Sequence, residues 1–458
     1  MIENDAFKLL LINLFHLNPD DIANIFCTTF NKMMVLLVTL ADKHQACPYC
    51  GFTAPKIKEY VTKEITHSAI TTQKCIIKYR ARRYKCPCCG KTYYEFNPFV
   101  FKSQKISILT VHNILKDLKD FNETFTSVAR RYHVSPTSVS TIFDNHVDIG
   151  RNPLPEIINF DEVYAFKSEK SKYVCVLLDF KKQIPVDVLP NRKKEYLLNY
   201  FQKIPLEERK KVKYACSDMY EVYRDVVHKV FPCSCMLLDY FHLSQDFHRK
   251  MNEVRIKVMK GYKDDKASDE YYLLKKFNWL LFKNPEDEDK YGRLFDVERE
   301  RKYNSHFKSY MNYYDLRRKL LEINNDLTIC YSLKLELVDF YSKSTIDNAQ
   351  VNLEHLIRSC IDTNIEEMIA FSNNLINWKQ EIINSFTIVG TEYKVEADKG
   401  QVVVCNKKVN NAIIENRNKI IKCIKNNANG YTNWSRFRNR VMYVLDPNTT
   451  FSLEPREK

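Results

Sequence analysis

The sequence predicts a multidomain chain of mixed α+β and α/β class, and three observations lead to that prediction. Two cysteine pairs of the same spacing lie in the first hundred residues. Short apolar segments typical of β-strands follow between residues 157 and 238, and a long helical pattern runs from about 243 to 385. At 458 residues, the chain also exceeds what a single hydrophobic core usually organises, so two or more domains are expected.

We place the boundaries of the expected domains where the pattern of apolar residues changes. Leu10, Leu14 and Leu17 give the start of the chain a helical period, whereas the short apolar runs of the middle of the chain have a β pattern. We predict an N-terminal helical segment (1–45), a zinc ribbon (46–98), a helix-turn-helix (99–150), the first part of a catalytic core (151–245), a helical insertion (246–400), and the final core helix with a basic tail (401–458).

Charge and cysteine usage narrow the class of protein. The net charge is +14, from 71 Lys and Arg against 57 Asp and Glu, which favours a polyanionic partner such as nucleic acid; a solvated basic surface is the alternative. The fifteen scattered cysteines and the acidic start of the chain do not resemble a secreted disulfide scaffold. The apolar run 33–40 is too short to span a bilayer, so we expect a protein of the reducing cytoplasm with no membrane partner.

Two matching cysteine knuckles predict a structural zinc site. Cys47 and Cys50, and then Cys86 and Cys89, each stand two residues apart and are followed by glycine, which lets the turn close. Four thiolates make a closed tetrahedral Zn²⁺ site with no position left for chemistry. Cys88 is a spare thiol in the second knuckle that could substitute, and free thiols or disulfides are the alternative.

Basic residues alternate with aromatic residues between the knuckles. Arg82 and Arg83 belong to a segment that we expect to form a strand contacting phosphates, although a solvated strand face is as good an explanation.

A helix-turn-helix is predicted directly after the ribbon. Ala129 suits a tight helix crossing, Val134 would fill the turn, and Ser135 can cap a second helix that starts with Pro136. A structural helical hairpin is the alternative. If the second helix enters the major groove, it exposes small polar side chains to the bases, namely Thr137, Ser138 and Ser140.

The β pattern has the order of a ribonuclease H-like core. Three consecutive strands (157–160, 173–179 and 185–189) are followed by a helix, a fourth strand ending at Asp218, a further helix and a fifth strand at 235–238. The long helical stretch would then interrupt this core before its final helix at about 408–427.

Three acidic residues in separate contexts form the candidate catalytic site. Asp161 and Asp218 follow apolar strand segments, and Glu415 lies on the late helix. A two-metal phosphoryl-transfer site needs hard oxygen ligands from distant segments, because two ions about 3.5–4 Å apart cannot be surrounded by one. We therefore predict two Mg²⁺ (or Mn²⁺) ions here, with Asp161 between them; taken singly, acidic residues in such positions are most often solvated.

Other acidic residues compete for this role. Glu162 follows Asp161 directly and should point to the opposite face of the strand. Asp239 and His242, at the end of the fifth strand, are expected to be structural or to lie outside the direct ligands.

Several of these segments together resemble the ISL-three family of bacterial insertion-sequence transposases. The segment 158–163 resembles the first catalytic block of the family, 217–223 with 239–242 resembles the second, and 411–422 with 430–440 resembles the third. The cysteine knuckles and the helix-turn-helix also match its amino-terminal region, so that the resemblance covers nearly the whole chain. Ala412 and Asn416 stand where the family usually has glycine.

The resemblance implies a transposase with an Asp-Asp-Glu triad, on which Asp161, Asp218 and Glu415 fall. Such an enzyme would cut and join double-stranded DNA, recognise terminal inverted repeats and a target, and act as a homodimer associated with the bacterial nucleoid. Further DNA contacts would come from basic residues after the triad glutamate, namely Lys419, Lys422, Arg436 and Arg438. The alternatives are a DNA-binding regulator derived from an inactive transposase and a nuclease that cuts without joining.

Overall fold

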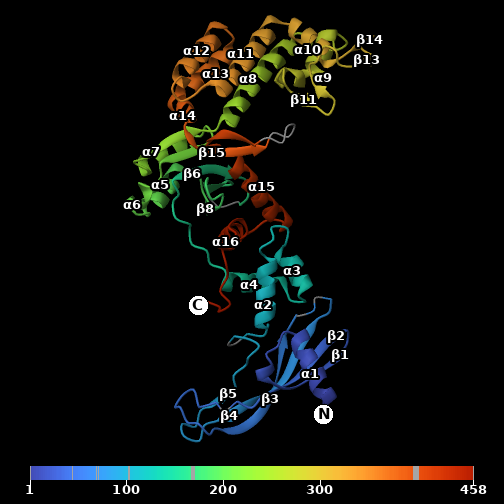
Figure 1. The fold of residues 1–458 in the computed structure, drawn as a ribbon, viewed down its shortest axis with the longest axis vertical. Coiled ribbons are helices and arrows are strands. Elements are labelled where there is room, and N and C mark those ends of the chain that lie inside the picture. The colour runs from blue at the N-terminus through green and yellow to red at the C-terminus, as the bar shows by residue number, and fades with distance from the viewer. Residues whose placement is uncertain are drawn as a thin grey trace.

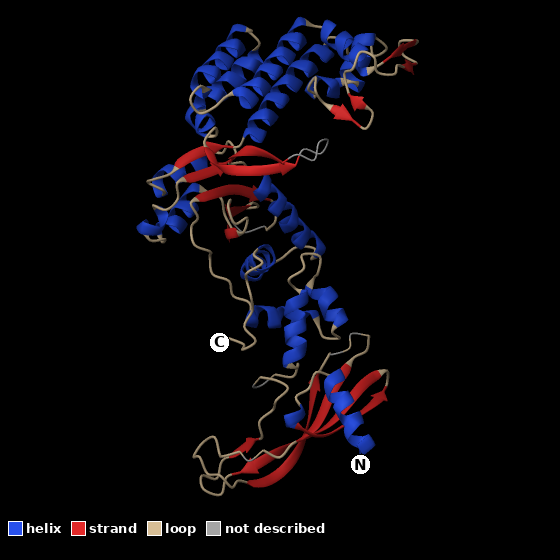
Figure 2. Ribbon diagram, in the orientation of Figure 1, coloured by secondary structure: helices blue, strands red, loops and turns tan. Residues whose placement is uncertain are grey.

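The computed structural model describes residues 2–43, 45–68, 70, 72–101, 104–166, 171–395 and 402–456. These residues form an elongated molecule (Figure 1) with a β-sheet and the first helix at one end, a helical region at the other, and a second sheet between them. Figure 2 shows that strands dominate the N-terminal end and helices the opposite end, whereas both occur around the second sheet.

The N-terminal region is largely β-structure. Its sheet has the order β1-β2-β4-β3, with β5 paired to β4. The elements are α1 (Ile2–Leu14), η1 (Pro19–Asp21), β1 (Ile22–Phe30), β2 (Met33–Leu40), β3 (Lys56–Thr66), β4 (Cys75–Lys85) and β5 (Thr92–Tyr94).

The helical segment expected over 1–45 is therefore wrong beyond α1. Residues 22–40 form an antiparallel hairpin, whose turn is made by Asn31 and Lys32 with positive φ values of 49° and 61°. A two-residue turn with left-handed backbone matches the twist of the strands that it joins. β2 buries Leu36, Val38 and Leu40 in the core that this sheet shares with α1, so the apolar run supplies core residues.

Three short helices follow, α2 (Ile108–Asp117), α3 (Phe125–Arg131) and α4 (Pro136–His146). The predicted cap of the last one is confirmed, because Ser135 accepts a hydrogen bond from the backbone N–H of Ser138 and Pro136 is the first helical residue. Val128, Ala129 and Val139 are buried between α3, α4 and their neighbours.

The second sheet has the order β10-β9-β6-β7-β8. β6 pairs antiparallel with β7 and parallel with β9, β7 pairs antiparallel with β8, and β9 pairs parallel with β10. The elements are β6 (Ile157–Val163), β7 (Val174–Asp179), β8 (Pro185–Leu189), α5 (Lys194–Gln202), α6 (Leu206–Arg209), β9 (Tyr214–Ser217), α7 (Glu221–Val230) and β10 (Cys235–Leu238).

Helices cover both faces of this sheet. Ile158 and Phe160 of β6 pack with α5 and α7 on one face, whereas Val163 of the same strand belongs to the core shared with α15 (Ala412–Asn427) and α16 (Trp434–Leu445) on the other. The expected basic tail thus contains a helix, α16, whose Phe437 and Val441 are buried.

The insertion is mostly helical and has its own large core. It comprises α8 (Tyr240–Lys260), α9 (Asp269–Lys276), η2 (Asn278–Phe282), α10 (Tyr313–Glu322), α11 (Asn325–Lys343), α12 (Ala349–Asp362), α13 (Glu366–Asn377) and α14 (Lys379–Asn384). It is not wholly helical, because three hairpins occur in it: β11 (Glu288–Asp289) with β12 (Gly292–Arg293), β13 (Lys302–Asn304) with β14 (Ser309–Met311), and β15 (Ile388–Val395) with β16 (Val402–Lys408). Within the described ranges, every helix is too short or too polar to cross a membrane.

Candidate metal centres and nucleic-acid contacts

Strand register brings Asp161 and Asp218 together. β6 and β9 run parallel with Asn159 opposite Cys216, and each aspartate stands two residues further along its strand direction. Side chains at matched positions of neighbouring parallel strands lie side by side. Accordingly, ligand oxygens of Asp161, Glu162 and Asp218 lie within 4.8 Å of one another.

Glu415 reaches the same end of the sheet from α15. The helix begins after Asn411, whose side-chain oxygen accepts a hydrogen bond of 2.7 Å from Asn159 Nδ2. Two turns after Asn411, Asn418 Nδ2 donates a 2.7 Å hydrogen bond to Asp161 Oδ2. Glu415 itself groups with Asp239 and His242, whose ligand atoms lie within 4.8 Å of one another and of its carboxylate.

Burial and like charge act on these carboxyl groups. Burial, together with the charges of Asp218, Glu162 and Glu415, raises the pKa of Asp161 to about 7, although a hydrogen bond from the Glu162 backbone opposes the shift. Burial and Glu162 also raise the pKa of Asp218 to about 6, although His242 and Arg192 lower it. Clustered carboxylates of this kind favour a dication, which would supply the compensating positive charge.

The donor set fits Mg²⁺ or Mn²⁺. Asp218 Oδ1 is buried and has no hydrogen-bond partner among the described residues, as an oxygen directed at an ion would have none. Hard carboxylate oxygens are the ligands that these ions prefer.

Two features of this site were missed or misjudged in the sequence. Glu162 does lie toward the opposite face, where Arg192 forms an ion pair with it and Tyr223 Oη donates a 3.2 Å hydrogen bond, yet its carboxylate still reaches Asp161 and Asp218. Asn418 was not recognised as a partner of Asp161, although its position one turn after Glu415 places both on one side of the helix.

The four predicted zinc ligands converge. Cys47 Sγ lies 3.7 Å from Cys89 Sγ, and Cys50 Sγ lies 3.5 Å from Cys86 Sγ. Four sulfurs at about 2.3 Å from one tetrahedral ion would be about 3.8 Å apart, so the cluster fits Zn²⁺. Cys88 is exposed and stands outside the group.

Each knuckle closes through the same backbone contacts. Gly51 N–H donates to Cys47 O at 2.8 Å and Gly90 N–H to Cys86 O at 2.9 Å, and both glycines have positive φ (74° and 69°). This left-handed backbone is the reason for glycine at these positions. Burial raises the pKa of the Cys86 thiol, but the backbone N–H groups of Cys89 and Cys88 and the Cys50 thiol outweigh it and lower the value to about 7, which favours the thiolate.

Comparison with known proteins agrees with this architecture. Residues 158–397, more than half of the chain, match the ISL3 DDE family model, whose description is "Transposase". The chain belongs to this transposase family. Residues 43–89 match the zinc-finger of transposase IS204/IS1001/IS1096/IS1165. The chain is also 20% identical over 409 residues to the transposase for insertion sequence element IS1001 of Bordetella parapertussis, covering 89% of this chain and 90% of that protein.

Glu415 lies beyond the segment of the transposase that the family model matches. Its place therefore rests on the contacts of α15 with β6 described above. Ala412 and Asn416, which stand where glycine was expected, are both exposed on α15 and do not press on the sheet.

The two arginines expected to contact DNA from the ribbon both form ion pairs within the chain, and Arg82 is largely buried. Arg82 donates to Glu95 Oε2 at 2.8 Å and to backbone oxygens of Leu40 and Ala41, with its side chain only 15% exposed. Arg83 pairs with Glu59 at 2.6 Å and is more exposed. Arg82 therefore ties β4 to the loop after β2. β4 nevertheless carries five basic residues and no acidic one.

The polar residues of α4 divide into two groups. Thr137 is exposed and Ser138 is half-buried, and both line a hollow of about 290 Å³ with Lys105 and Asn145. Ser140 is buried and donates to the Thr137 carbonyl, so it does not face solvent as expected.

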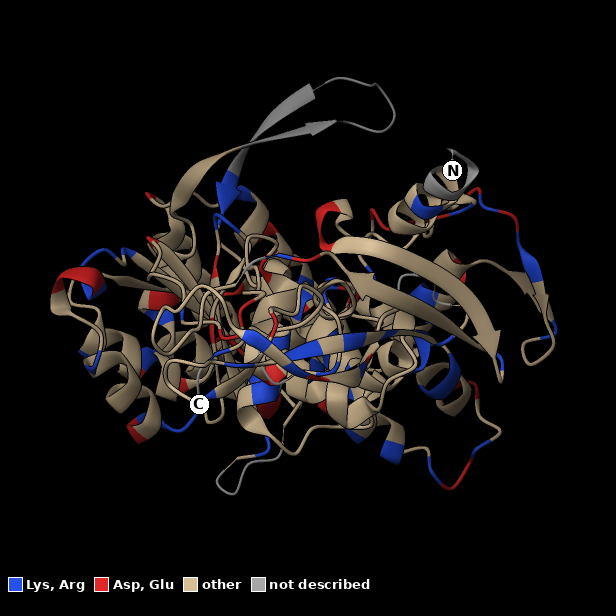
Figure 3. Ribbon diagram, turned by 90° about the horizontal axis from the view of Figure 1, so that it is seen from below, with Lys and Arg blue, Asp and Glu red and all other residues tan. Residues whose placement is uncertain are grey.

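The basic residues after Glu415 also divide. Lys419 and Lys422 are exposed on α15. Arg436 forms an ion pair of 2.6 Å with Asp144 of α4, and Arg438 pairs with Asp187 of β8. The two arginines therefore join α16 to its neighbours rather than presenting free guanidinium groups to DNA. Figure 3 shows basic and acidic segments interspersed along the chain.

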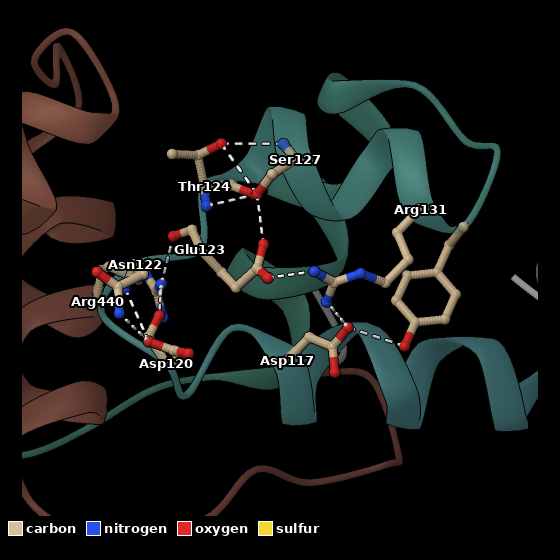
Figure 4. A network of polar contacts seen from close by, with 9 residues as sticks. Asp117, Asp120, Asn122, Glu123, Thr124, Ser127, Arg131 and Arg440 are labelled. Atoms are coloured by element: carbon tan, nitrogen blue, oxygen red, sulfur yellow. Dashed lines mark hydrogen bonds and ion pairs between the residues drawn. The ribbon is translucent and has the colours of Figure 1, made fainter.

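The loop between α2 and α3 is fixed by a network that no sequence pattern indicated (Figure 4). Arg440 of α16 is 1% exposed, and its Nη2 donates 2.8 Å hydrogen bonds to the carbonyl oxygens of Asp120 and Glu123. Arg131 of α3 forms ion pairs with Asp117 and Glu123. The three short helices and α16 are thus one connected unit.

Proposed function

We propose that this transposase binds the terminal inverted repeats of an insertion sequence and catalyses metal-dependent cleavage and transfer of DNA strands. The observation that carries the proposal is that Asp161 and Asp218 lie together on two adjacent strands, and that Glu415, on a helix 197 residues after Asp218, is near enough for its charge to raise the pKa of Asp161. Carboxylates gathered in this way from distant segments are what two-metal phosphoryl transfer requires.

The sheet supports a ribonuclease H-like core. Its order is β10-β9-β6-β7-β8, and β7 is the one strand of this sheet that runs opposite to the other four. In sequence, the helical insertion separates β10 from α15. Asp161 and Asp218 stand toward the carboxyl ends of the parallel strands β6 and β9, where open α/β sheets usually hold their sites.

The chain's own residues would organise the reaction as follows. Asp161, Asp218 and Glu415 would hold two Mg²⁺ or Mn²⁺ ions. When bound, such ions lower the pKa of an attacking hydroxyl and stabilise the leaving oxygen. Asn418 fixes the rotamer of Asp161, so the carboxylate is oriented before DNA arrives. Lys419 and Lys422 are placed to neutralise phosphates beside the cut.

DNA recognition is assigned to the zinc ribbon and to α3–α4 as a helix-turn-helix. The basic strand β4 with Arg83 would contact the DNA backbone, and Thr137 and Ser138 at the start of α4 would face a groove. The name of the curated relative, a transposase for an insertion sequence element, supports the terminal repeats of such an element as the substrate.

We also propose that the transposase acts as a homodimer, because two element ends must be cut together. The edge strand β1 has no charged residue and exposes Phe26 and Phe30, and an uncharged edge can pair with its own copy about a two-fold axis. Light scattering should report a dimer that Phe26→Lys dissociates; a monomer for the unsubstituted chain would contradict this.

Cleavage of a DNA duplex that carries the terminal repeat of the element tests the whole proposal. With Mg²⁺ or Mn²⁺, the protein should release a 3′ end and join it to a second DNA. Asp161→Asn, Asp218→Asn and Glu415→Gln should each abolish both steps while binding to the repeat remains. Binding without cleavage by the unsubstituted chain would identify a DNA-binding regulator, and cleavage without joining would identify a nuclease.

A further inference from the structure

We infer that Asp239, His242 and Glu415 form a divalent-cation site of mixed nitrogen and oxygen donors, distinct in its ligands from the all-oxygen group of Asp161, Glu162 and Asp218. The inference deepens the proposed function, because it divides the two-ion centre into two chemically different halves. It also changes the role of Asp239 and His242, which the sequence led us to expect outside the direct ligands.

The sheet places Asp239 beside Asp218 in the same way as it places Asp218 beside Asp161. β10 runs parallel to β9, with Leu238 opposite Ser217. Asp239 follows Leu238 and Asp218 follows Ser217, so the two aspartates are neighbours. Three aspartates therefore stand in a row at the carboxyl ends of β6, β9 and β10. Asp239 is only 4% exposed.

His242 follows Asp239 by three residues on the first turn of α8, so the two side chains share one side of the helix. α15 approaches this turn from the opposite end of the sequence and brings Glu415. Such a site needs both ends of the helical insertion in place, since α8 starts the insertion and α15 follows it.

The spacing within this group fits a shared ion better than direct hydrogen bonds. His242 Nε2 lies 3.8 Å from Asp239 Oδ2 and 3.7 Å from Glu415 Oε1, and both distances are too long for a hydrogen bond. Two ligand atoms at about 2.1–2.2 Å from one ion are about 3.0–3.8 Å apart when their angle at the ion is about 90–120°, and the two distances lie at the wide-angle end of that range.

The imidazole nitrogen itself points to a ligand. His242 Nε2 is buried from solvent and has no hydrogen-bond partner among the residues that the structure describes. A buried ring nitrogen without a partner is costly, and binding to a cation is one of the ordinary ways in which the cost is removed.

Donor chemistry then predicts which ion each half prefers. Imidazole suits first-row transition dications, whereas carboxylate oxygens alone suit Mg²⁺. We therefore expect the His242 site to take Mn²⁺ in preference to Mg²⁺, and the Asp161–Glu162–Asp218 group to accept either.

Electron paramagnetic resonance with Mn²⁺ as the probe tests this on the full-length chain with its zinc site loaded. The ¹⁴N coupling of an imidazole ligand should appear in the pulsed spectrum of the unsubstituted chain and disappear in His242→Gln, which should also lose one of its two Mn²⁺ ions in a titration. His248→Gln is the matched control, because His248 lies on the same helix, is also partly buried, and packs against Phe282 outside the group.

A second substitution covers the case in which His242→Gln fails to fold, as judged by its thermal unfolding. Asp239→Asn keeps the size of the side chain and should weaken the same Mn²⁺ ion by about 10-fold or more while Asp161→Asn weakens the other. No ¹⁴N coupling in the unsubstituted chain, or the same coupling in His242→Gln, would overturn the inference.

These outcomes separate the inference from the proposed function. A chain that shows the coupling but never cleaves DNA would keep this cation site and lose the transposition chemistry. A chain that cleaves and joins DNA without the coupling would keep the proposed function and lose His242 as a ligand.

Discussion

Asn418 Nδ2 donates a hydrogen bond of 2.7 Å to Asp161 Oδ2, joining the helix that carries Glu415 to the strand that carries the first aspartate. Asn418 is 6% exposed, and its own Oδ1 has no hydrogen-bond partner within the described ranges. The contact therefore fixes the distance between two elements that are 257 residues apart in the sequence.

Removing this contact should affect metal binding before it affects the fold. We expect Asn418→Ala to raise the Mn²⁺ concentration needed for half-maximal DNA cleavage by about 10–100-fold, the usual effect of losing a group that orients a metal ligand. Asn416→Ala, on the exposed side of the same helix, is the control and should leave the metal dependence unchanged. An unchanged metal dependence in Asn418→Ala would show that Asp161 needs no orienting partner.

The pKa of Asp161 predicts how stability depends on pH. Burial raises this pKa from 3.8 to about 7, so between these values the folded chain holds a proton that the unfolded chain releases. The resulting contribution to stability is fully present below about pH 4 and is lost as pH rises through about 7. Without added Mg²⁺ or Mn²⁺, Asp161→Asn should therefore melt at a higher temperature than the unsubstituted chain at pH 8, with a smaller difference at pH 5.

Adding Mn²⁺ provides the control for that measurement. The ion binds the ionised carboxylate, so it should raise the melting temperature of the unsubstituted chain at pH 8 more than that of Asp161→Asn. A melting temperature of Asp161→Asn that falls below that of the unsubstituted chain at pH 8 without metal would contradict the raised pKa.

Binding of zinc should contribute directly to the folding stability of the ribbon. Cys47→Ser removes one of four sulfurs, and we expect the segment between the knuckles to become sensitive to proteolysis and the bound zinc to fall below one ion per chain. Cys88→Ser changes an exposed thiol of the same knuckle and should retain the zinc. Full zinc content in Cys47→Ser would mean that another group replaces the ligand.

Patterns local in sequence were predicted best. The strands of the second sheet and the four zinc ligands could be predicted because apolar runs and two-residue cysteine spacing are short-range signals. The N-terminal hairpin was not predicted, because its turn residues Asn31 and Lys32 adopt left-handed backbone without glycine, and its apolar run carries no alternation clear enough to distinguish strand from helix.

Charge partners could not be predicted in the same way. Arg82, Arg436 and Arg438 resemble DNA-binding arginines in sequence, but each meets a carboxylate from a distant element. Asp239 and His242 lie beside Glu415, which α15 brings from beyond the helical insertion. Such contacts depend on tertiary packing between segments hundreds of residues apart, which one sequence does not reveal.

The buried guanidinium of Arg440 should hold the unit of α2, α3, α4 and α16 together. Its Nη2 donates to two backbone carbonyls of the α2–α3 loop, at Asp120 and Glu123, and α16 packs against β8 of the central sheet. Replacing it with methionine keeps much of the volume but leaves both carbonyl oxygens without this donor. Each charge-assisted hydrogen bond contributes about 1.5–3 kcal/mol, so we expect a loss of several kcal/mol for this unit.

Limited proteolysis and urea unfolding would measure that effect. Arg440→Met should open the loop at residues 119–124 to cleavage and lower the urea midpoint of the transition that includes α16, whereas Arg456→Met, which breaks an exposed ion pair with Asp148, should change the midpoint little. DNA binding would then weaken in Arg440→Met while the Mn²⁺ spectrum of the central sheet stays the same, because the arginine touches none of the acidic residues. Equal protection of the loop in both variants would show that packing of α16 alone is enough to hold it.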